Sequence, residues 1–261
     1  PFRKQTVHVD RSTLPRPMVV FDAVEVLLEN VAELIVGDVR DEVWAEDIRR
    51  NPFRTSGGVD LHGYRAGDEV GKRGIESSME AELRGTRGRV VSHRNGEEIE
   101  RSQPAGGEDV QITVDMKLQA RIEAVLSTEL GLMRVQPWHR NSVLPEGTPL
   151  RGAVVVLDVE TSEVLAMVST PALRDEEDIE GYPWLNRAAQ GYYPPGSIIK
   201  PLVLVSAMTE GKLAHGESID CVGHFFEHVK DAARCWIYRA EYNYATHTSL
   251  EPVEALARSC N

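Results

Sequence analysis

Residues 193–201 read Tyr-Pro-Pro-Gly-Ser-Ile-Ile-Lys-Pro, and they constrain this chain more than any other stretch. Two prolines and a glycine enforce a non-helical approach, and the apolar run at 202–208 predicts a buried helix that ends at Gly211. Ser197 would open this helix, where free backbone N–H groups and the positive end of the helix dipole can stabilise an oxyanion. Lys200 lies three residues on and shares a face with Ser197, so a desolvated lysine amine can act as its base. The stretch therefore predicts a nucleophile and its activator on one helical turn.

A bare Ser-x-x-Lys pair occurs by chance in many helices, so the flanking residues matter. The complete stretch 193–201 resembles the active-serine motif of penicillin-binding proteins, which share Ser-x-x-Lys with serine β-lactamases. This resemblance extends from about residue 60 to the end of the chain. It implies an α+β fold in which helices pack on an antiparallel sheet, and it implies that Ser197 and Lys200 are catalytic.

Composition narrows the class of protein. The chain has 261 residues, of which 41% are hydrophobic, which suits one large or two ordinary globular domains. Its net charge of −12 gives no general attraction to nucleic acid or anionic lipid, and we expect no nucleic-acid partner. No apolar run approaches the roughly 20 residues of a membrane helix, and no signal peptide opens the chain. Class B penicillin-binding proteins usually carry an N-terminal membrane anchor, so the resemblance implies an extracytoplasmic location and an inner-membrane anchor that precedes this sequence.

The first part of the chain, residues 1–105, is predicted to be a pedestal module of the dimerisation type. Residues 1–19 suit an extended lead-in, and the spacing of apolar residues over 21–37 predicts a helix. A shorter helix is expected at 41–50, ended by the Asn-Pro pair that follows. Both helices are predicted to be scaffold.

Residues 71–88 resemble the Gly-Arg-x-Gly-x-Glu…Glu-x-x-Leu-Arg-Gly stretch in the pedestal of class B penicillin-binding proteins. Glycines bracket a predicted helix in which Ile75, Met79 and Leu83 share one face. Arg84 stands next to a glycine and suits a turn. We assign no chemistry to this stretch.

The Gly/Pro cluster at 104–109 is predicted to separate the pedestal from residues 106–261, the N-terminal part of a transpeptidase domain. Residues 111–114 are expected to form a strand. Asp115 can then cap a helix whose apolar stripe runs over 118–130. The catalytic domain of the family opens similarly.

Residues 132–150 are rich in turn formers and are predicted to form an exposed loop. The apolar runs 153–158 and 164–169 flank a short turn and predict a β-hairpin that sits inside a sheet. They resemble the first two strands of the family's catalytic domain. Ser162 stands where a glycine is common.

A second motif closes the chain. Thr248 and Glu251 fit a capping box, which predicts a helix that delivers Ser259-Cys260-Asn261 about 60 residues after the first motif. In the family, Ser-x-Asn is the second catalytic motif. The resemblance implies that the Ser259 hydroxyl helps to relay protons and that the Asn261 amide holds the substrate's peptide carbonyl. The third motif, Lys-Thr/Ser-Gly, is missing, which we interpret as truncation, so that the chain by itself can be inactive.

The region between the two motifs contains a set of three thiols and one imidazole, a common tetrahedral zinc set, from Cys221, Cys235, Cys260 and His247. Some elongation-type class B enzymes hold a metal beside the active site, and the resemblance places Cys260 at its last ligand. Three states stay open from the residues alone: structural zinc, a Cys221–Cys235 disulfide with a buried free Cys260, or three buried thiols. His224 or His228 could replace His247.

The resemblance implies a class B penicillin-binding protein, of the elongation type. Its reaction would be the crosslinking of peptidoglycan stem peptides through an acyl-enzyme on Ser197, with β-lactams as inhibitors and no cofactor needed for the chemistry. The implied partners are a SEDS-type glycosyltransferase and rod-shape scaffold proteins. Two other hypotheses stay open: a non-catalytic pedestal or scaffold module of a cell-wall synthesis complex, and a β-lactamase or β-lactam sensor.

Overall fold

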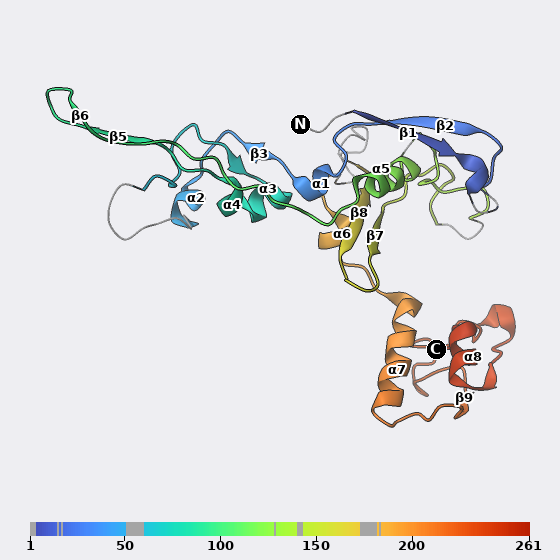
Figure 1. Ribbon diagram of the computed structural model, residues 1–261. Coiled ribbons are helices and arrows are strands. Elements are labelled where there is room, and N and C mark those ends of the chain that lie inside the picture. The colour runs from blue at the N-terminus through green and yellow to red at the C-terminus, as the bar shows by residue number, and fades with distance from the viewer. Residues whose placement is uncertain are drawn as a thin grey trace. The chain divides into compact units, whose positions relative to one another are not determined.

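The computed structural model describes residues 4–14, 16, 18–50, 60–127, 129–139, 143–172, 182 and 184–261 (Figure 1). The chain divides into two compact units, an N-terminal unit (Pro1–Tyr192) and a C-terminal unit (Tyr193–Asn261). Both units mix helices with antiparallel strand pairs, in agreement with the α+β prediction. Within the described ranges, no helix combines the length and the apolar character needed to cross a membrane. The module boundary near residue 105 stays a prediction.

The chain opens with a β-hairpin. β1 (Gln5–Asp10) pairs antiparallel with β2 (Ala23–Leu28), so that Val9 lies opposite Val24. A 3-10 turn, η1 (Arg11–Thr13), follows β1 directly. The extended lead-in expected at the start of the chain is therefore half of a hairpin.

The helix predicted over 21–37 is wrong for its first half. Only α1 (Glu33–Val36) is helical there. The earlier residues form β2 instead, because Val24, Val26 and Leu28 also repeat with period 2. The side chains of Val26 and Leu28 are fully buried on one face of the hairpin. A strand needs a partner, and β1 supplies one from outside the window in which the helical spacing was measured.

The next part of the N-terminal unit consists of short elements: β3 (Val39–Arg40), α2 (Ala45–Arg50), β4 (Val70–Gly71), α3 (Gly74–Ser78), α4 (Glu80–Leu83), β5 (Arg89–Ser92) and β6 (Glu98–Ser102). β3 pairs antiparallel with β4. β5 pairs antiparallel with β6, and these two strands form the green hairpin labelled in Figure 1. α2 confirms the second half of the helix expected at 41–50, and the Asn-Pro pair after it lies outside the described residues. The single helix predicted within 71–88 is two helices, because Met79 leaves the helical region at φ −112° and ψ 23°.

Asp68 anchors an ionic network beside α4. Its carboxylate accepts hydrogen bonds from Arg84, at 2.6 Å, and from Arg87, and Arg84 also pairs with Glu80 at 3.2 Å. The Arg84 guanidinium lies 4.2 Å from the ring centroid of Tyr64. The turn expected at Arg84 is therefore held by side-chain ion pairs.

α5 (Met116–Val125) begins as predicted, because the Asp115 side chain accepts hydrogen bonds from the backbone N–H groups of Lys117 and Leu118. The helix ends five residues before the predicted stripe does. The side chains that α5 buries are also not those of the predicted apolar stripe. They are Gln119, Ala120 and Ala124.

Residues 111–114 do not form a strand. Instead, the Thr113 hydroxyl and the Asp115 backbone N–H donate to two carbonyls of β8 (Val164–Thr170), at 2.7 and 2.9 Å. One side-chain hydrogen bond and one backbone hydrogen bond attach this segment to β8, without the regular series of backbone hydrogen bonds that a strand pair has. The segment therefore runs beside β8 as irregular backbone.

The predicted hairpin is confirmed. β7 (Gly152–Leu157) pairs antiparallel with β8, and Ser162 in the turn has φ +62°, the left-handed region that favours glycine. Residues 132–139 and 143–150, the described parts of the predicted loop, contain neither helix nor strand segments. α6 (Arg187–Gln190) follows, capped by the side chain of Asn186.

The core of the N-terminal unit joins the first hairpin to α5. Its buried side chains come from β2 and β1, from the turn before α1, and from α5 and the segment that follows it: Val9, Val26, Leu28, Val31, Ala32, Ala120, Ala124 and Leu130. Gln119 is also buried. Its side chain accepts a hydrogen bond from Met167 N–H and donates one to Met167 C=O, each at 2.9 Å. These two bonds satisfy a buried amide and attach α5 to β8.

The C-terminal unit consists of η3 (Gly196–Ile199), α7 (Lys200–Thr209), β9 (Ile219–Cys221), η4 (Ala240–Tyr242), β10 (Thr248–Leu250) and α8 (Pro252–Ala257). β9 pairs antiparallel with β10. The capping box predicted at Thr248 and Glu251 is wrong. Thr248 belongs to β10, and Glu251 is the N-cap residue of α8, which begins at Pro252, without a side-chain cap bond.

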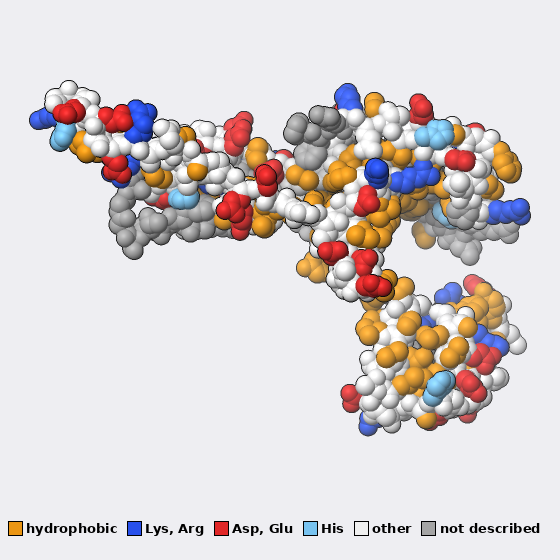
Figure 2. All heavy atoms as spheres, viewed as in Figure 1, with side chains coloured by type: hydrophobic (Ala, Val, Ile, Leu, Met, Phe, Trp, Pro, Cys, Tyr) orange, Lys and Arg blue, Asp and Glu red, His pale blue; other side chains and the backbone are white. Residues whose placement is uncertain are grey.

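The apolar helix predicted after Ser197 forms, but it is not buried. Within α7, Leu202, Val203 and Val205 are 62%, 58% and 59% exposed, and none of its side chains is buried in the described part of the chain. Figure 2 shows hydrophobic side chains spread over the visible face of this unit. Apolar composition predicts that a helix has something to bury, and it does not say which element covers it.

Candidate active site

The first motif forms a tight turn into α7. Pro195 is in the right-handed helical region and Gly196 has φ +58°, a conformation that glycine adopts without steric cost. Ser197 follows in η3, where its carbonyl accepts the backbone N–H of Lys200, and Pro201 stands in the first turn of α7. Ser197 is exposed and Lys200 is half-buried. The geometry of the turn matches the helix entry predicted from the two prolines and the glycine.

A chain of hydrogen bonds joins the two motifs. Lys200 Nζ lies 3.0 Å from Ser259 Oγ, and Ser259 Oγ lies 3.1 Å from Ser197 Oγ. Lys200 Nζ also donates to the Ser259 carbonyl at 2.7 Å. The hydroxyl of Ser259 therefore lies between the amine and the hydroxyl that the first motif supplies. The chain separates these groups by about 60 residues, and the fold brings them into contact.

Ser259 is held in place by the end of α8. Its N–H donates to Leu256 C=O and the N–H of Cys260 donates to Ala255 C=O, both at 2.9 Å, while Ser259 has φ +50°. This pair of bonds around a left-handed residue is a Schellman C-cap, in which glycine is the usual residue. The cap turns the Ser259 hydroxyl toward Lys200 and sends Cys260 in another direction.

Asn261 completes the second motif. Its Nδ2 donates to the Arg234 carbonyl at 2.5 Å, and its side chain is exposed. An amide has two N–H groups and one carbonyl, so one N–H and the carbonyl can still bind another group. Asn261 is therefore tied to the loop at 234 and still has polar atoms for a ligand.

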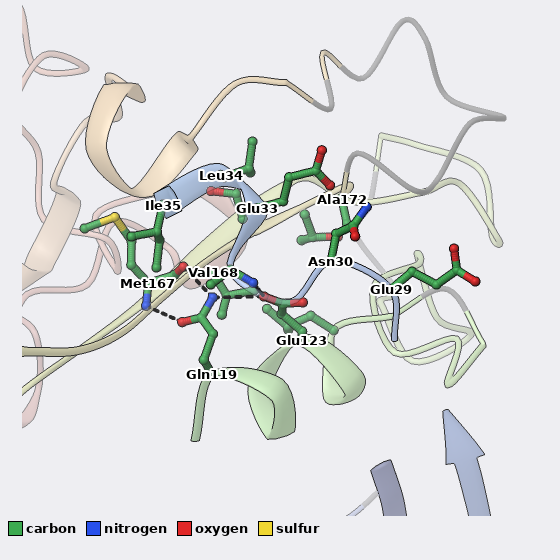
Figure 3. Close-up of a pocket in the computed structure, with 14 residues that line it drawn as sticks. Glu29, Asn30, Glu33, Leu34, Ile35, Gln119, Glu123, Met167, Val168 and Ala172 are labelled. Carbon is green, nitrogen blue, oxygen red and sulfur yellow. Dashed lines mark hydrogen bonds between the residues drawn. The ribbon is translucent and has the colours of Figure 1, made fainter. Parts of the chain in front are cut away.

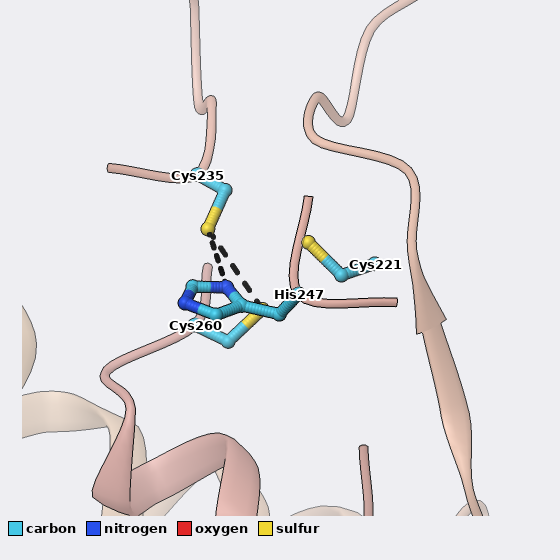
Figure 4. A group of neighbouring side chains, drawn as sticks. All are labelled: Cys221, Cys235, His247 and Cys260. Carbon is cyan, nitrogen blue, oxygen red and sulfur yellow. Dashed lines mark hydrogen bonds between the residues drawn. The ribbon is translucent and has the colours of Figure 1, made fainter. Parts of the chain in front are cut away.

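The four side chains of the predicted metal set converge (Figure 4). The ligand atoms of Cys221, Cys235, His247 and Cys260 all lie within 4.8 Å of one another. Cys235 Sγ lies 3.9 Å from Cys260 Sγ and 3.2 Å from His247 Nδ1. The imidazole that joins the thiols is thus that of His247, as predicted, and not that of either alternative histidine.

One of these distances can be compared with that in a tetrahedral zinc site. Two sulfurs that are each about 2.3 Å from a tetrahedral zinc lie about 3.8 Å apart, close to the separation of the Cys235 and Cys260 sulfurs. The donor set of three sulfurs and one nitrogen is also one that zinc prefers. All three cysteines are free thiols, so the Cys221–Cys235 disulfide does not form in this structure.

The thiols differ in acidity. Desolvation raises the pKa of Cys221, but hydrogen bonds from the backbone of His247, from Cys260 and from the Gly223 backbone outweigh it, and its pKa lies below the ordinary value. Desolvation, with hydrogen bonding to Cys221 and the charge of Cys235, raises the pKa of Cys260 to about 12. The cluster therefore favours a thiolate at Cys221 before Cys260.

A separate pocket lies in the N-terminal unit, among α1, α5 and β8 (Figure 3). Glu123 Oε1 accepts hydrogen bonds from the Ala32 backbone N–H and from Gln119 Nε2, each at 2.9 Å. Burial raises the pKa of Glu33, which also lines this pocket. The pocket contains none of the site residues predicted from sequence.

Within the loop at 234–236, only Cys235 was predicted from the sequence to contribute to the site. Besides the Arg234 carbonyl and the Cys235 thiol, it supplies Trp236, whose indole N–H donates to the Arg258 carbonyl at 2.9 Å. The only sequence signal that could have found this tryptophan is its place directly after a candidate ligand. Its partner is a backbone atom, which leaves no trace in side-chain patterns.

Two family models match the chain. Residues 26–112 match the penicillin-binding protein dimerisation domain, and residues 152–261 match the penicillin-binding protein transpeptidase domain. The first range overlaps the predicted pedestal (1–105) and extends past its predicted end, and the second lies within the predicted transpeptidase part (106–261).

The curated relatives that match this chain are named peptidoglycan D,D-transpeptidases. Peptidoglycan D,D-transpeptidase MrdA of Haemophilus influenzae is 34% identical over 181 residues, which are 62% of this chain and 25% of the relative. MrdA of Escherichia coli is 32% identical over 183 residues, 61% of this chain and 25% of the relative. FtsI of Escherichia coli is 26% identical over 204 residues, 72% of this chain and 31% of the relative. The matched part of the chain thus spans about a quarter to a third of the length of these relatives.

A solved structure is similar in fold. The crystal structure of Pseudomonas aeruginosa PBP2 in complex with WCK 5153 matches with a TM-score of 0.57 and 23% identity, over 88% of this chain and 43% of that chain. The chain is therefore similar to penicillin-binding proteins over two consecutive domains, a dimerisation domain and a transpeptidase domain, in agreement with the class B resemblance.

Proposed function

We propose that this chain is part of a peptidoglycan D,D-transpeptidase and supplies its nucleophile, its base and its second motif. The observation that carries the proposal is the hydrogen-bonded chain from Lys200 through Ser259 to Ser197. The names of the relatives support the same substrate class. The groups are exposed or half-buried, so a peptide can reach Ser197.

The proposed reaction is acyl transfer in two steps. Ser197 Oγ attacks the carbonyl of the penultimate D-alanine, while its proton passes to Ser259 Oγ and the proton of Ser259 passes to the neutral amine of Lys200. The C–N bond to the terminal D-alanine then breaks, and the nitrogen of the departing D-alanine takes the proton that Lys200 had accepted. In the second step an amine of a neighbouring stem peptide attacks the ester and forms the crosslink, the C–O bond to Ser197 breaks, and the proton that the amine loses returns to Ser197 Oγ. Hydroxyl hydrogens rotate, so the Ser259 bonds can reverse direction during the relay.

The active serine is tested by covalent labelling. We expect a fluorescent penicillin to acylate Ser197 in the protein expressed from its complete gene, because the β-lactam ring opens by the same attack. Mass spectrometry should locate the adduct on the peptide that contains Ser197, and Ser197→Ala should abolish it. Ser206→Ala, at an exposed position of α7, is the matched control. Equal labelling of the Ser197→Ala protein would refute the proposal, and rapid loss of the label would favour a β-lactamase.

We also propose a structural zinc at Cys221, Cys235, His247 and Cys260. The converging ligand atoms and the sulfur separation that fits tetrahedral zinc support this proposal. When bound, zinc would supply a crosslink rather than chemistry. Through Cys260, the residue between Ser259 and Asn261, it would hold both polar residues of the second motif in place. Elemental analysis of protein purified without added metal tests this, and less than about a tenth of an equivalent of zinc would end it.

We propose an elongation role with the pedestal as the partner surface. MrdA relatives are more similar than FtsI, at 34% and 32% identity against 26%, and residues 26–112 match the dimerisation domain. The proposed partners are a SEDS-type glycosyltransferase and rod-shape scaffold proteins, at an extracytoplasmic location with an inner-membrane anchor. Depletion should give round cells in a rod-shaped host. Filaments would assign the protein to division instead.

A further inference from the structure

Three consecutive residues of one loop hold the second motif. The Arg234 carbonyl accepts Nδ2 of Asn261, Cys235 Sγ lies 3.9 Å from Cys260 Sγ, and Trp236 Nε1 donates to the Arg258 carbonyl at 2.9 Å. The first two contacts reach residues on the far side of Ser259. The indole reaches the residue that precedes it. Ser259 is therefore held from both directions along the chain.

The indole bond adds a contact on the carbonyl side of the peptide unit that precedes Ser259. The carbonyl of Arg258 and the N–H of Ser259 belong to one planar peptide unit. The N–H side of that plane is fixed by Leu256 C=O, and the carbonyl side is fixed by Trp236. With both sides held, the plane cannot rotate, and Ser259 keeps the left-handed φ of +50°.

This restraint matters because a serine does not favour that conformation. Residues other than glycine adopt left-handed φ only at a cost in free energy, so the surrounding contacts must hold them there. If the Arg258 carbonyl lost its donor, the peptide plane could turn and Ser259 could relax. Its hydroxyl would then leave Lys200, Ser197 or both.

The tryptophan ring is itself fixed by two neighbours. It packs edge-on against Tyr242, with ring centroids 5.7 Å apart at 84°, and lies 5.8 Å from the ring of His247. Trp236 is 42% exposed, while its indole N–H points to the end of α8. An aromatic side chain held by two rings is a stiff donor, and stiffness is what a positioning group requires.

We propose that Trp236 is a positioning residue for Ser259, and that its indole N–H sets the rate of proton relay between Ser197 and Lys200. The inference rests on the proposed acylation of Ser197. The indole bond itself involves none of the four candidate metal ligands, although the ring lies beside one of them, His247.

The test is the rate of acylation by a fluorescent penicillin in the protein expressed from its complete gene. Trp236→Phe keeps an aromatic ring but removes the donor. We expect the first-order acylation rate constant to fall by about fivefold, the loss that one hydrogen bond produces, with the dissociation constant of the non-covalent complex unchanged. Trp236→His retains a ring N–H at similar reach and should restore at least half of the rate.

The matched control is Trp44→Phe in the N-terminal unit. Trp44 is 48% exposed and its indole N–H also donates, to Glu42 at 3.2 Å, so the same chemical change is made far from the second motif in sequence. Its acylation rate should equal that of the unchanged protein. Equal rates in Trp236→Phe, or a slow Trp236→His, would overturn the inference. So would a parallel loss of affinity and thermal stability, which marks a merely structural role. If the unchanged protein is not acylated at Ser197, the proposed function fails first.

Discussion

The two units of the molecule bury very different amounts of apolar surface. In the N-terminal unit, residues from two strands and a distant helix form one core, and Val9, Val26 and Leu28 are fully buried. In the C-terminal unit, burial in the described residues is limited to the following: Leu213, Gly223, Cys235, Leu250 and Pro252. The one fully buried large side chain in this second group is a candidate metal ligand, Cys235.

The difference teaches how each unit holds its functional geometry. A large apolar core stabilises a unit through area removed from water, whereas a small unit with little core needs a crosslink. Under the zinc proposal, the thiol and imidazole cluster would be the crosslink of the C-terminal unit, because its ligands come from β9, the loop at 234–236, the segment before β10 and the end of α8. The site residues then depend on the cluster, and the following changes test that dependence.

The largest effect is expected from Cys235→Ser. Losing a buried ligand should unfold the C-terminal unit and leave the N-terminal unit folded, because a structural zinc contributes on the order of 10 kcal/mol to such a site. Hydrogen exchange read by mass spectrometry resolves the two units, and a chelator should reproduce the pattern. Ser206→Ala is the control on α7. Native protection of residues 193–261 in Cys235→Ser would show that the cluster is dispensable.

Leu28→Ala weakens the core of the N-terminal unit instead of the cluster of the C-terminal unit. Leu28 is fully buried between the hairpin and α5, and its truncation should cost the N-terminal unit about 2–5 kcal/mol while the metal content stays the same. Leu27→Ala is a matched control, because Leu27 is next in sequence, is 49% exposed and lies on the other face of β2. Urea unfolding measures both. Equal losses for the two variants would contradict the strand assignment of β2.

Asp68→Asn tests the ionic network of the N-terminal unit. Burial raises the pKa of Asp68, but hydrogen bonds from Arg87, the Arg65 backbone and Arg84 outweigh it and hold the pKa at about 2. A lowered pKa means that the stability from this group is present above its unfolded pKa of about 4 and is lost as the pH falls toward 2.

We therefore expect Asp68→Asn to destabilise the unit by about 1–2 kcal/mol at neutral pH and to converge with the unchanged protein near pH 2. Urea unfolding across that pH range provides the measurement. The adjacent, exposed Glu69 serves as control through Glu69→Gln. A constant difference from pH 7 to pH 2 would rule out the ionic explanation.

The smallest effect, and a gain, is expected from Ser162→Gly. Ser162 occupies φ +62° in the β7–β8 turn, so glycine should stabilise the unit by up to about 1 kcal/mol. Ser162→Ala has the same steric conflict as serine and should give no gain. Thermal unfolding of both variants checks this, and a gain from alanine would mean that backbone strain is not the cause.

Local features could be predicted from the sequence because they depend on neighbours a few residues apart. The Asp115 cap, the β7–β8 hairpin and the turn through Gly196 into the helix after Ser197 all belong to this group. The four candidate metal ligands were also predicted by donor type, since three thiols and a histidine in one region are a chemically distinctive set.

The residues of the chain determined, by themselves, the two motifs and the class of reaction that they favour. Only the tertiary structure decided that β2 is a strand, because its partner lies outside the window of helical spacing. The tertiary structure also decided that Ser259 lies between Lys200 and Ser197. It further decided that the Trp236 indole N–H bonds to the Arg258 carbonyl, in the peptide unit that precedes Ser259. Those arrangements come from contacts between distant segments and from backbone atoms, which side-chain patterns along a sequence do not encode.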